Sequence, residues 1–158
     1  MDLPLVDRPV EVRALATTAP AGPTPVLLTC VICEDELRSA RTGRLTVRDL
    51  AYVWTTSALP LRVDLDVVTL WWIRAIERPY RFMTRVRDLD GGVLDLVESE
   101  MAFEKPAVHE QMARFAMLEF QAGGVYRVEV LLDDDVVGTY PLFVQVVESD
   151  TAAVKQEA

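Results

Sequence analysis

The sequence predicts an all-β protein: an immunoglobulin-like, two-sheet antiparallel β-sandwich of about seven or eight strands with a proline-rich N-terminal arm. Runs of β-branched and aromatic residues alternate with turn signals at intervals of roughly 8–12 residues, which is typical of such sandwiches. The pair Asp90-Gly91 favours a tight hairpin loop. Tyr126 follows Gly123-Gly124, where two-sheet sandwiches have a corner tyrosine that hydrogen-bonds back to the chain.

Proline and small polar residues divide the chain into three parts. Residues 1–25 hold five of the nine prolines, and proline lacks the donor that a strand ladder needs. We therefore predict an arm or linker over residues 1–24, a β-sandwich domain over 25–148 and a flexible tail over 149–158. Within the arm, Val10–Leu15 could still add to a sheet edge.

The first strands are predicted from apolar runs. Val26–Cys33 is apolar on both faces, as in a central strand. The charged segment Glu34–Arg44 closes in a turn at Thr42-Gly43. Apolar residues alternate loosely through Arg44–Trp54, where Asp49 disturbs the period, and we expect one further strand there.

The clearest hairpin joins Tyr80–Val86 to Val93–Phe103 through the Asp-Gly turn. The turn places Tyr80, Phe82, Thr84 and Val86 on one face together with Val97, Met101 and Phe103. The other face carries Arg81, Arg85 and Arg87 opposite Glu98 and Glu100. Opposite charges on neighbouring strands stabilise a pairing, so we interpret this run as a solvated face that fixes register.

The last third of the domain is predicted to be strand as well. The apolar residues of Met112–Gln121 do not distinguish a helical period from a strand period, and the composition of the segment would suit a short helix. We predict a strand because the segment leads directly into the Gly-Gly turn. Gly124–Val130 and Val136–Val147 then form a hairpin closed by the acidic turn Asp133-Asp134-Asp135.

Composition excludes some partners. The net charge is −9, whereas nucleic-acid binding needs a basic face, so no nucleic acid is expected. The strongly apolar run Val67–Ile73 is far shorter than the ~20 residues that span a bilayer, so no membrane is expected either. The first residues show no cationic start followed by an apolar run, and a cytoplasmic protein is the prediction. Abundant Arg, Ala, Val and Asp suggest a GC-rich genome.

Two cysteines, Cys30 and Cys33, form a C-x-x-C pair that could indicate redox or zinc chemistry. On the predicted strand, residues three apart point to opposite faces, so both sulfurs would not meet one metal. A structural zinc site wants four ligands, and the other soft candidate is His109. We interpret both thiols as buried, and we expect no cofactor.

Catalytic and metal sites have little support. His109 lies in Glu104–Glu110, which is predicted as an exposed loop, and no catalytic residue is assigned. Two acidic turns allow a weaker alternative, a Ca²⁺ or glycan site in the sandwich loops, provided that both turns lie at the same end. Its carboxylates would be Asp88, Asp90, Asp133 and Asp135. Aspartate also favours turns without any ion.

The segment Arg62–Ile76 carries the feature that a plain monomer explains least. It alternates at first and then becomes apolar on both faces. If Val67, Thr69, Trp71 and Ile73 face the core, the opposite face presents a predicted partner-binding surface of Val68, Leu70, Trp72 and Arg74. The proline-rich arm, a second copy or a different protein could cover this face. The remaining alternative is a strand that changes sheets through a bulge, so that both faces are covered internally.

Two parts of the chain resemble a family of small bacterial proteins of unknown function. The opening Pro25–Cys30, the acidic Glu34-Asp35-Glu36 and Gly43–Val47 are similar to the start of that family. Gly124–Val130, Asp133-Asp134 and Tyr140-Pro141-Leu142 are similar to its end. The resemblance covers about residues 25–148 and departs at Val47–Leu50, where members usually continue into a Gly-containing apolar strand. It implies a single β-sandwich domain and no activity.

The function expected from these observations is a non-enzymatic binding or structural module. It would act through self-association, giving a homo-oligomer, or by docking to a larger bacterial assembly. A hydrolase is the least favoured alternative, because no nucleophile, base and orienting group occur together in the sequence.

Overall fold

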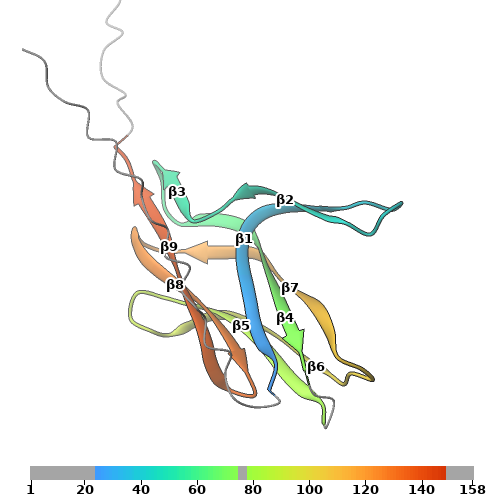
Figure 1. Cartoon of the computed structure of the whole chain (residues 1–158). Coiled ribbons are helices and arrows are strands. Elements are labelled where there is room, and N and C mark those ends of the chain that lie inside the picture. The colour runs from blue at the N-terminus through green and yellow to red at the C-terminus, as the bar shows by residue number, and fades with distance from the viewer. Residues whose placement is uncertain (1–23, 75–77, 149–158) are drawn as a thin grey trace, which may run out of the picture.

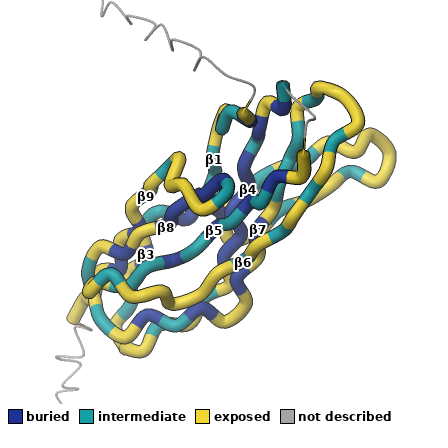
Figure 2. Tube along the Cα trace, turned by 90° about the horizontal axis from the view of Figure 1, so that it is seen from below, coloured by how far each residue is buried: buried dark blue, intermediate teal, exposed yellow. Residues whose placement is uncertain are grey.

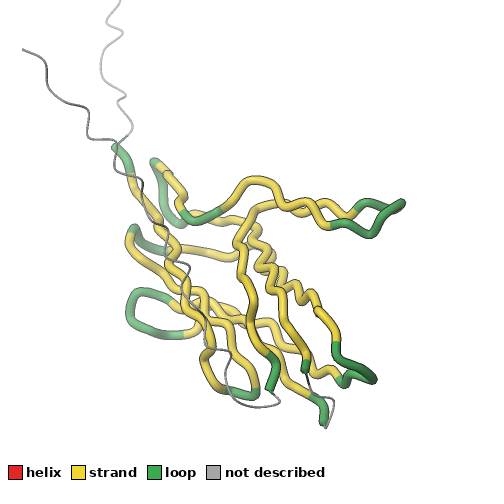
Figure 3. Tube along the Cα trace, viewed as in Figure 1, coloured by secondary structure: helices red, strands yellow, loops and turns green. Residues whose placement is uncertain are grey.

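The computed structural model describes residues 24–74 and 78–148, and the predicted arm (except Thr24) and the whole predicted tail lie outside this part. The described residues form strands and loops without a helix (Figures 1 and 3). The predicted all-β class is confirmed. The strands are β1 (Val26–Arg38), β2 (Leu45–Leu50), β3 (Val53–Thr56), β4 (Leu61–Ile73), β5 (Tyr80–Arg87), β6 (Val93–Met101), β7 (Ala107–Phe120), β8 (Gly124–Leu132) and β9 (Asp135–Val146).

The strands form two sheets that face each other. One has the order β2-β1-β4-β7 and the other β3-β9-β8-β5-β6. Strands β4 and β7 pair in the first sheet, while β5, β8 and β9 pair in the second, as the B, E and C, F, G strands of immunoglobulin domains do. The predicted immunoglobulin-like sandwich is confirmed. The described part has nine strands because one predicted segment forms two strands, and a second segment forms a longer strand than expected.

One of these segments changes sheets. The single strand expected over Arg44–Trp54 is wrong: β2 pairs with β1 in the first sheet, and β3 runs parallel to β9 in the second. Between them the Ala51 N–H donates to the Ile32 oxygen of β1, and the Tyr52 oxygen accepts from Phe143 of β9. The Ala51 side chain is buried in the core at the point where the chain crosses from one sheet to the other.

The other segment is longer than expected. The strand that was predicted to end at Cys33 continues to Arg38, and its last part pairs only with β2. Residues 34–50 therefore form a hairpin that projects from the two sheets, on the right of Figure 1. We call it the β1–β2 arm.

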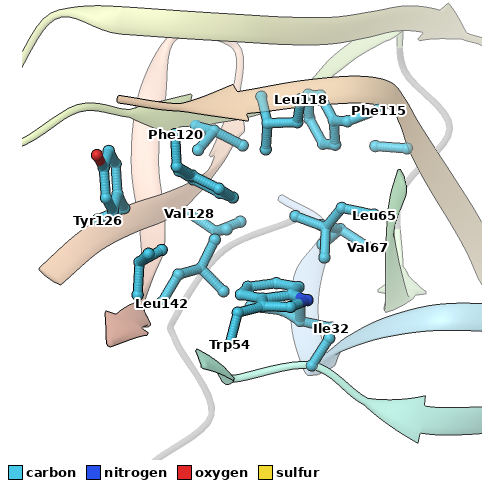
Figure 4. Packing of buried hydrophobic residues seen from close by; sticks show 14 residues of the cluster. Ile32, Trp54, Leu65, Val67, Phe115, Leu118, Phe120, Tyr126, Val128 and Leu142 are labelled. Carbon is cyan, nitrogen blue, oxygen red and sulfur yellow. The ribbon is translucent and has the colours of Figure 1, made fainter. Parts of the chain in front are cut away.

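Apolar side chains fill the space between the sheets, and Figure 2 shows buried residues along the strands and exposed residues at the hairpin ends. In the cluster drawn in Figure 4, the Phe120 ring lies 5.8 Å from Trp54 and 4.5 Å from Tyr126, between centroids. A second cluster surrounds Trp71, whose indole meets the Phe82 ring edge-on at 5.0 Å. These aromatic contacts tie the two sheets together.

Tyr126 forms the predicted corner. Its hydroxyl donates to the Ala122 oxygen at 2.8 Å and lies 3.3 Å from the Ala122 nitrogen. The ring is buried against Phe120. The tyrosine therefore fixes the connection from β7 to β8, at the place where the chain passes from one sheet to the other.

Both predicted hairpins have the expected pairing. In the β5–β6 hairpin Tyr80 pairs with Met101 and Arg81 with Glu100. The β8–β9 turn has positive φ at both central residues, 49° at Asp133 and 74° at Asp134, as a type I′ turn requires. Aspartate tolerates this conformation better than most residues, which explains the acidic turn.

The arginines on the outer face of the five-stranded sheet have other partners than predicted. Arg85 and Arg87 both donate through Nε to Glu129 Oε2 of β8, at 2.6 and 2.7 Å, and Arg81 pairs with Asp134. Arg81 lies opposite Glu100 in the strand register, as expected, but no ion pair to Glu98 or Glu100 is found among the described residues. These arginines instead pair with Glu129 of β8, which flanks β5 on its other side, and with Asp134 of the β8–β9 turn. Burial by itself raises the pKa of Glu129, but the hydrogen bonds from Arg87 and Arg85 outweigh it and hold that pKa below the ordinary 4.5.

Removing the corner hydroxyl should destabilise the fold without changing it. We expect Tyr126→Phe to lower the free energy of unfolding by about 1–2 kcal/mol, because a buried hydrogen bond is lost. Urea denaturation followed by circular dichroism measures this. Tyr52→Phe is the control, since no hydrogen bond of its hydroxyl occurs in the described part of the chain, and it should be nearly neutral. Equal effects of the two variants would contradict the corner role.

Glu129 should make stability depend on acid pH. Because its folded-state pKa lies below the unfolded value of 4.5, the stabilisation is complete above that pH and is lost as the pH falls through the folded-state pKa. We expect Glu129→Gln to be less stable than wild type near neutral pH and to lose less stability on acidification. Urea midpoints measured between about pH 3 and 7 give both slopes, and parallel slopes would contradict the prediction.

Candidate interaction surface

Strand β4 has two apolar faces, as the sequence predicts. Its inward side chains Val67, Thr69, Trp71 and Ile73 are buried between the sheets. The Trp71 indole N–H donates to Thr69 Oγ1 at 2.8 Å, so the buried polar atoms of this face bond to each other. From Asp66 onward the outward side chains become steadily more exposed: Asp66 and Val68 are buried, Leu70 is half-buried and Trp72 is 44% exposed.

The β1–β2 arm explains the covered end. Two ion pairs bridge it to the outer face of β7: Glu36 lies 3.8 Å from Arg114, and Arg38 pairs with Glu110. Arg114 also donates two hydrogen bonds of 2.8 Å to the buried Asp66 carboxylate. Cys33 is buried beside them and lies 3.6 Å from the Asp66 backbone oxygen. The outer face is therefore closed at its arm end within the chain itself.

The other end of this face is open and apolar. Trp72 pairs with Val26 of β1 on one side and with Val108 of β7 on the other, and directly paired residues share a face. Leu70 is the next outward residue of β4 before Trp72. Met112 of β7 pairs with Val68, the outward residue before Leu70. We call Val26, Leu70, Trp72, Val108 and Met112 the Trp72 surface.

The Trp72 surface is exposed and lies at the edge of its sheet. Val108 is 65% exposed and Met112 37%, and β7 is an edge strand of the described sheet. The Arg74 guanidinium carbon lies 5.5 Å from the centre of the Trp72 ring, where a cation is attracted to the indole face. Exposed apolar side chains grouped in this way and bordered by charges are typical of a protein contact site.

Of the four residues predicted to bind a partner, three lie at the open end. Leu70, Trp72 and Arg74 can be reached from outside, whereas Val68 is only 4% exposed and cannot contact another molecule. The sequence could not show that Val68 is buried, because the β1–β2 arm that covers it comes from a distant part of the chain. Sequence reasoning missed Val108 because Glu104–Glu110 was predicted as an exposed loop. It also missed Met112, because the bulge later in β7 breaks the alternation of that strand.

The cysteines do not form a metal or redox pair in this structure. Cys30 packs inward against both core clusters, while Cys33 lies on the outer face near Asp66. Both are unpaired thiols. Burial raises the pKa of Cys30 to about 12, and burial together with the nearby carboxylates raises that of Cys33 to about 11. Both thiols are therefore protonated at neutral pH and poorly nucleophilic.

The two acidic turns lie at opposite ends of the sheet. Asp88 and Asp90 follow Arg87, which pairs with Arg127, whereas Asp133 and Asp135 follow Leu132, which pairs with Phe82. Five strand residues, or roughly 17 Å, separate these positions. No group of three or more potential ligands that could hold a metal ion occurs in the described ranges. The four carboxylates thus do not form one site.

Two of the four turn aspartates, Asp88 and Asp133, already have partners. Asp88 Oδ1 accepts from the Gly92 nitrogen within its own turn. Asp133 accepts from Arg78 and from the Arg81 nitrogen, and the Arg78 hydrogen bond holds the pKa of Asp133 below its ordinary value. A cavity of about 440 Å³ between the start of β1 and the β8–β9 turn includes Arg78 and Asp133, so this ion pair occupies its polar side.

His109 lies on a strand, and the predicted loop is wrong. β7 begins at Ala107, and His109 pairs with Trp71 of β4. Its ring packs against Phe103 and Phe82, with centroids 5.1 and 5.9 Å away, and Nε2 lies 3.3 Å from the amide oxygen of Gln111. An amide cannot stabilise an imidazolium as a carboxylate does. The predicted strand over Met112–Gln121 is confirmed as the later part of β7.

The fold and this surface define the protein as a single immunoglobulin-like sandwich with one partly open apolar sheet face. Residues 28–145 match the profile of the Family of unknown function (DUF6941), and the chain belongs to this family. The resemblance to a family of unknown function is thus confirmed. No curated protein matches the chain.

Among solved structures, the chain is similar to the CARDB domain of the PF1109 protein from Pyrococcus furiosus, crystallised in complex with di-metal ions. The TM-score is 0.40 and the sequence identity 10%, and the match covers 76% of this chain and 88% of that chain. At this similarity the ligand of that domain says nothing about this protein. The described residues contain no helix long and apolar enough to traverse a bilayer.

The thiols should resist modification in the folded protein. We expect both cysteines to react with Ellman's reagent at pH 8 at least roughly a hundredfold more slowly than a free thiol, because few thiolates form. In denaturant both should react at once. Rapid labelling of either thiol in the native state would contradict the assigned burial. Zn²⁺ added to the native protein should leave the labelling rate unchanged.

Proposed function

We propose that this protein is a non-enzymatic binding module that acts through the Trp72 surface, by self-association or by docking to a larger assembly. The observation that carries the proposal is the 44% exposure of Trp72 in the middle of the apolar row Val26–Trp72–Val108. Tryptophan is enriched at the energetic centres of protein interfaces, and Arg74 adds a second residue type that is common there.

A binding role agrees better with the side-chain chemistry than an enzymatic one. The two thiols have raised pKa values, and the histidine ring contacts an amide and two phenylalanines. Nucleophilic catalysis needs the opposite: an activated nucleophile beside a base that a third group orients. The unpaired thiols also support a cytoplasmic setting, where cysteines stay reduced.

Replacing the central aromatic should reduce association while the fold survives. We expect the solution mass of the wild-type chain to rise with concentration, and that of Trp72→Arg to stay at the monomer value, because a charge replaces the apolar centre of the contact. Light scattering over a concentration series measures this. Val125→Arg is the matched control, since Val125 is 50% exposed on the outer face of the other sheet.

The control should associate as the wild type does. Identical masses of wild type and Trp72→Arg at every concentration would remove self-association through this surface. Equal loss in Val125→Arg and Trp72→Arg would show that added charge, rather than the Trp72 surface, prevents the contact.

A further inference from the structure

We infer that the Trp72 surface is covered within its own chain by the segment that precedes Thr24, with Val10–Leu15 as the stretch that lies on it. The cover regulates the binding proposed above, and in this respect the inference rests on the proposed function. The cover itself does not depend on that function, because it can be measured on the isolated monomer.

The first argument is where the chain enters the fold. Thr24 and Pro25 lead directly into Val26, and Val26 pairs with Trp72. The preceding residues therefore begin at one end of the exposed row. Val108, the other end of that row, lies two strands away, which is roughly 10 Å.

The second argument is reach. Residues 16–24 connect Val10–Leu15 to β1 and span up to about 30 Å when extended, which is enough to place that stretch anywhere on the row. A segment held on so short a tether has an effective concentration in the millimolar range. At micromolar protein concentrations it therefore has an advantage over a second copy of similar intrinsic affinity.

The third argument is the pattern of the stretch itself. Val10, Val12 and Ala14 alternate with Glu11 and Arg13, which is the period of a strand, and only Leu15 at the end adds an apolar residue to the charged side. Such a stretch can present valines to an apolar sheet face while its charges meet water. The surface in turn ends at β7, an edge strand of the described sheet, where an extended segment can be accommodated.

The proposed cover has a counterpart at the opposite end of the same face. There the β1–β2 arm closes over Val68 and Asp66 through Glu36 and Arg38. The N-terminal segment would complete the cover at the Trp72 end. Partner binding then requires the segment to leave, so the apparent affinity for a partner falls with the fraction of chains in which the surface is covered.

Tryptophan fluorescence tests the cover on the full-length chain. The protein has three tryptophans, and Trp54 and Trp71 are buried, so a soluble quencher reports mainly on Trp72. At concentrations where light scattering finds only monomer, acrylamide should quench the wild type weakly. Val10→Ser/Val12→Ser should lose this protection. The matched control Glu11→Ser/Arg13→Ser changes the other side of the same stretch and should keep it.

Trp72→Phe calibrates the signal from the two buried indoles. Strong quenching of Trp72 in the monomeric wild type, or equal effects of the two double variants, would overturn the cover. Protection that appears only as concentration rises would assign the surface to a second copy and would also overturn it.

The cover and the proposed function can fail separately. If both hold, Val10→Ser/Val12→Ser associates at lower concentration than wild type, and adding Trp72→Arg abolishes that gain. Loss of quenching protection without any change in mass would leave the cover standing and remove self-association. If Trp72→Arg lowers the solution mass but Val10→Ser/Val12→Ser leaves the quenching unchanged, self-association stands and the cover is removed.

Discussion

The need to cover both faces of β4 is the constraint on which the rest of this structure depends. Its inward side chains, from Val67 to Ile73, require a second sheet, and Trp71 meets Phe82 of that sheet edge-on. Its outward side chains require cover of another kind, because an antiparallel sheet normally presents polar residues there. In the described structure the inward side chains are covered completely, whereas the outward side chains are covered only near the β1–β2 arm.

The outer cover combines charge with backbone geometry. β1 runs past the end of its pairing with β4 and forms an arm with β2, and Glu36 and Arg38 connect this arm to β7. Arg114 then binds Asp66, whose carboxylate would otherwise be buried without a partner. A buried charge is tolerated only when it is paired in this way. The hydrogen bonds from Arg114 thus make the burial of Asp66 tolerable, but they do not drive it.

This arrangement gives the open end a different character from the closed end. Around Trp72 the face has aromatic and aliphatic side chains, an arginine over the indole and an adjoining strand edge, which are the features of a contact site. The histidine ring, by contrast, packs against an aromatic ring, and burial raises the pKa values of both thiols.

The sequence by itself determined the elements whose signals are local. The Asp90-Gly91 turn, the alternation of β4 and the corner position of Tyr126 each follow from neighbouring residues, and each is found in the structure. Cys30 and Cys33 point to opposite faces for the same reason, because strand period alone fixes their directions. Tertiary structure decided what depends on distant partners: Glu129 rather than Glu98 for the arginines, a strand for His109, and the crossing at Ala51. It also decided that the described residues cover Val68 and leave Trp72 exposed, because the β1–β2 arm lies over only one part of this face and no local pattern encodes where a hairpin arm will lie.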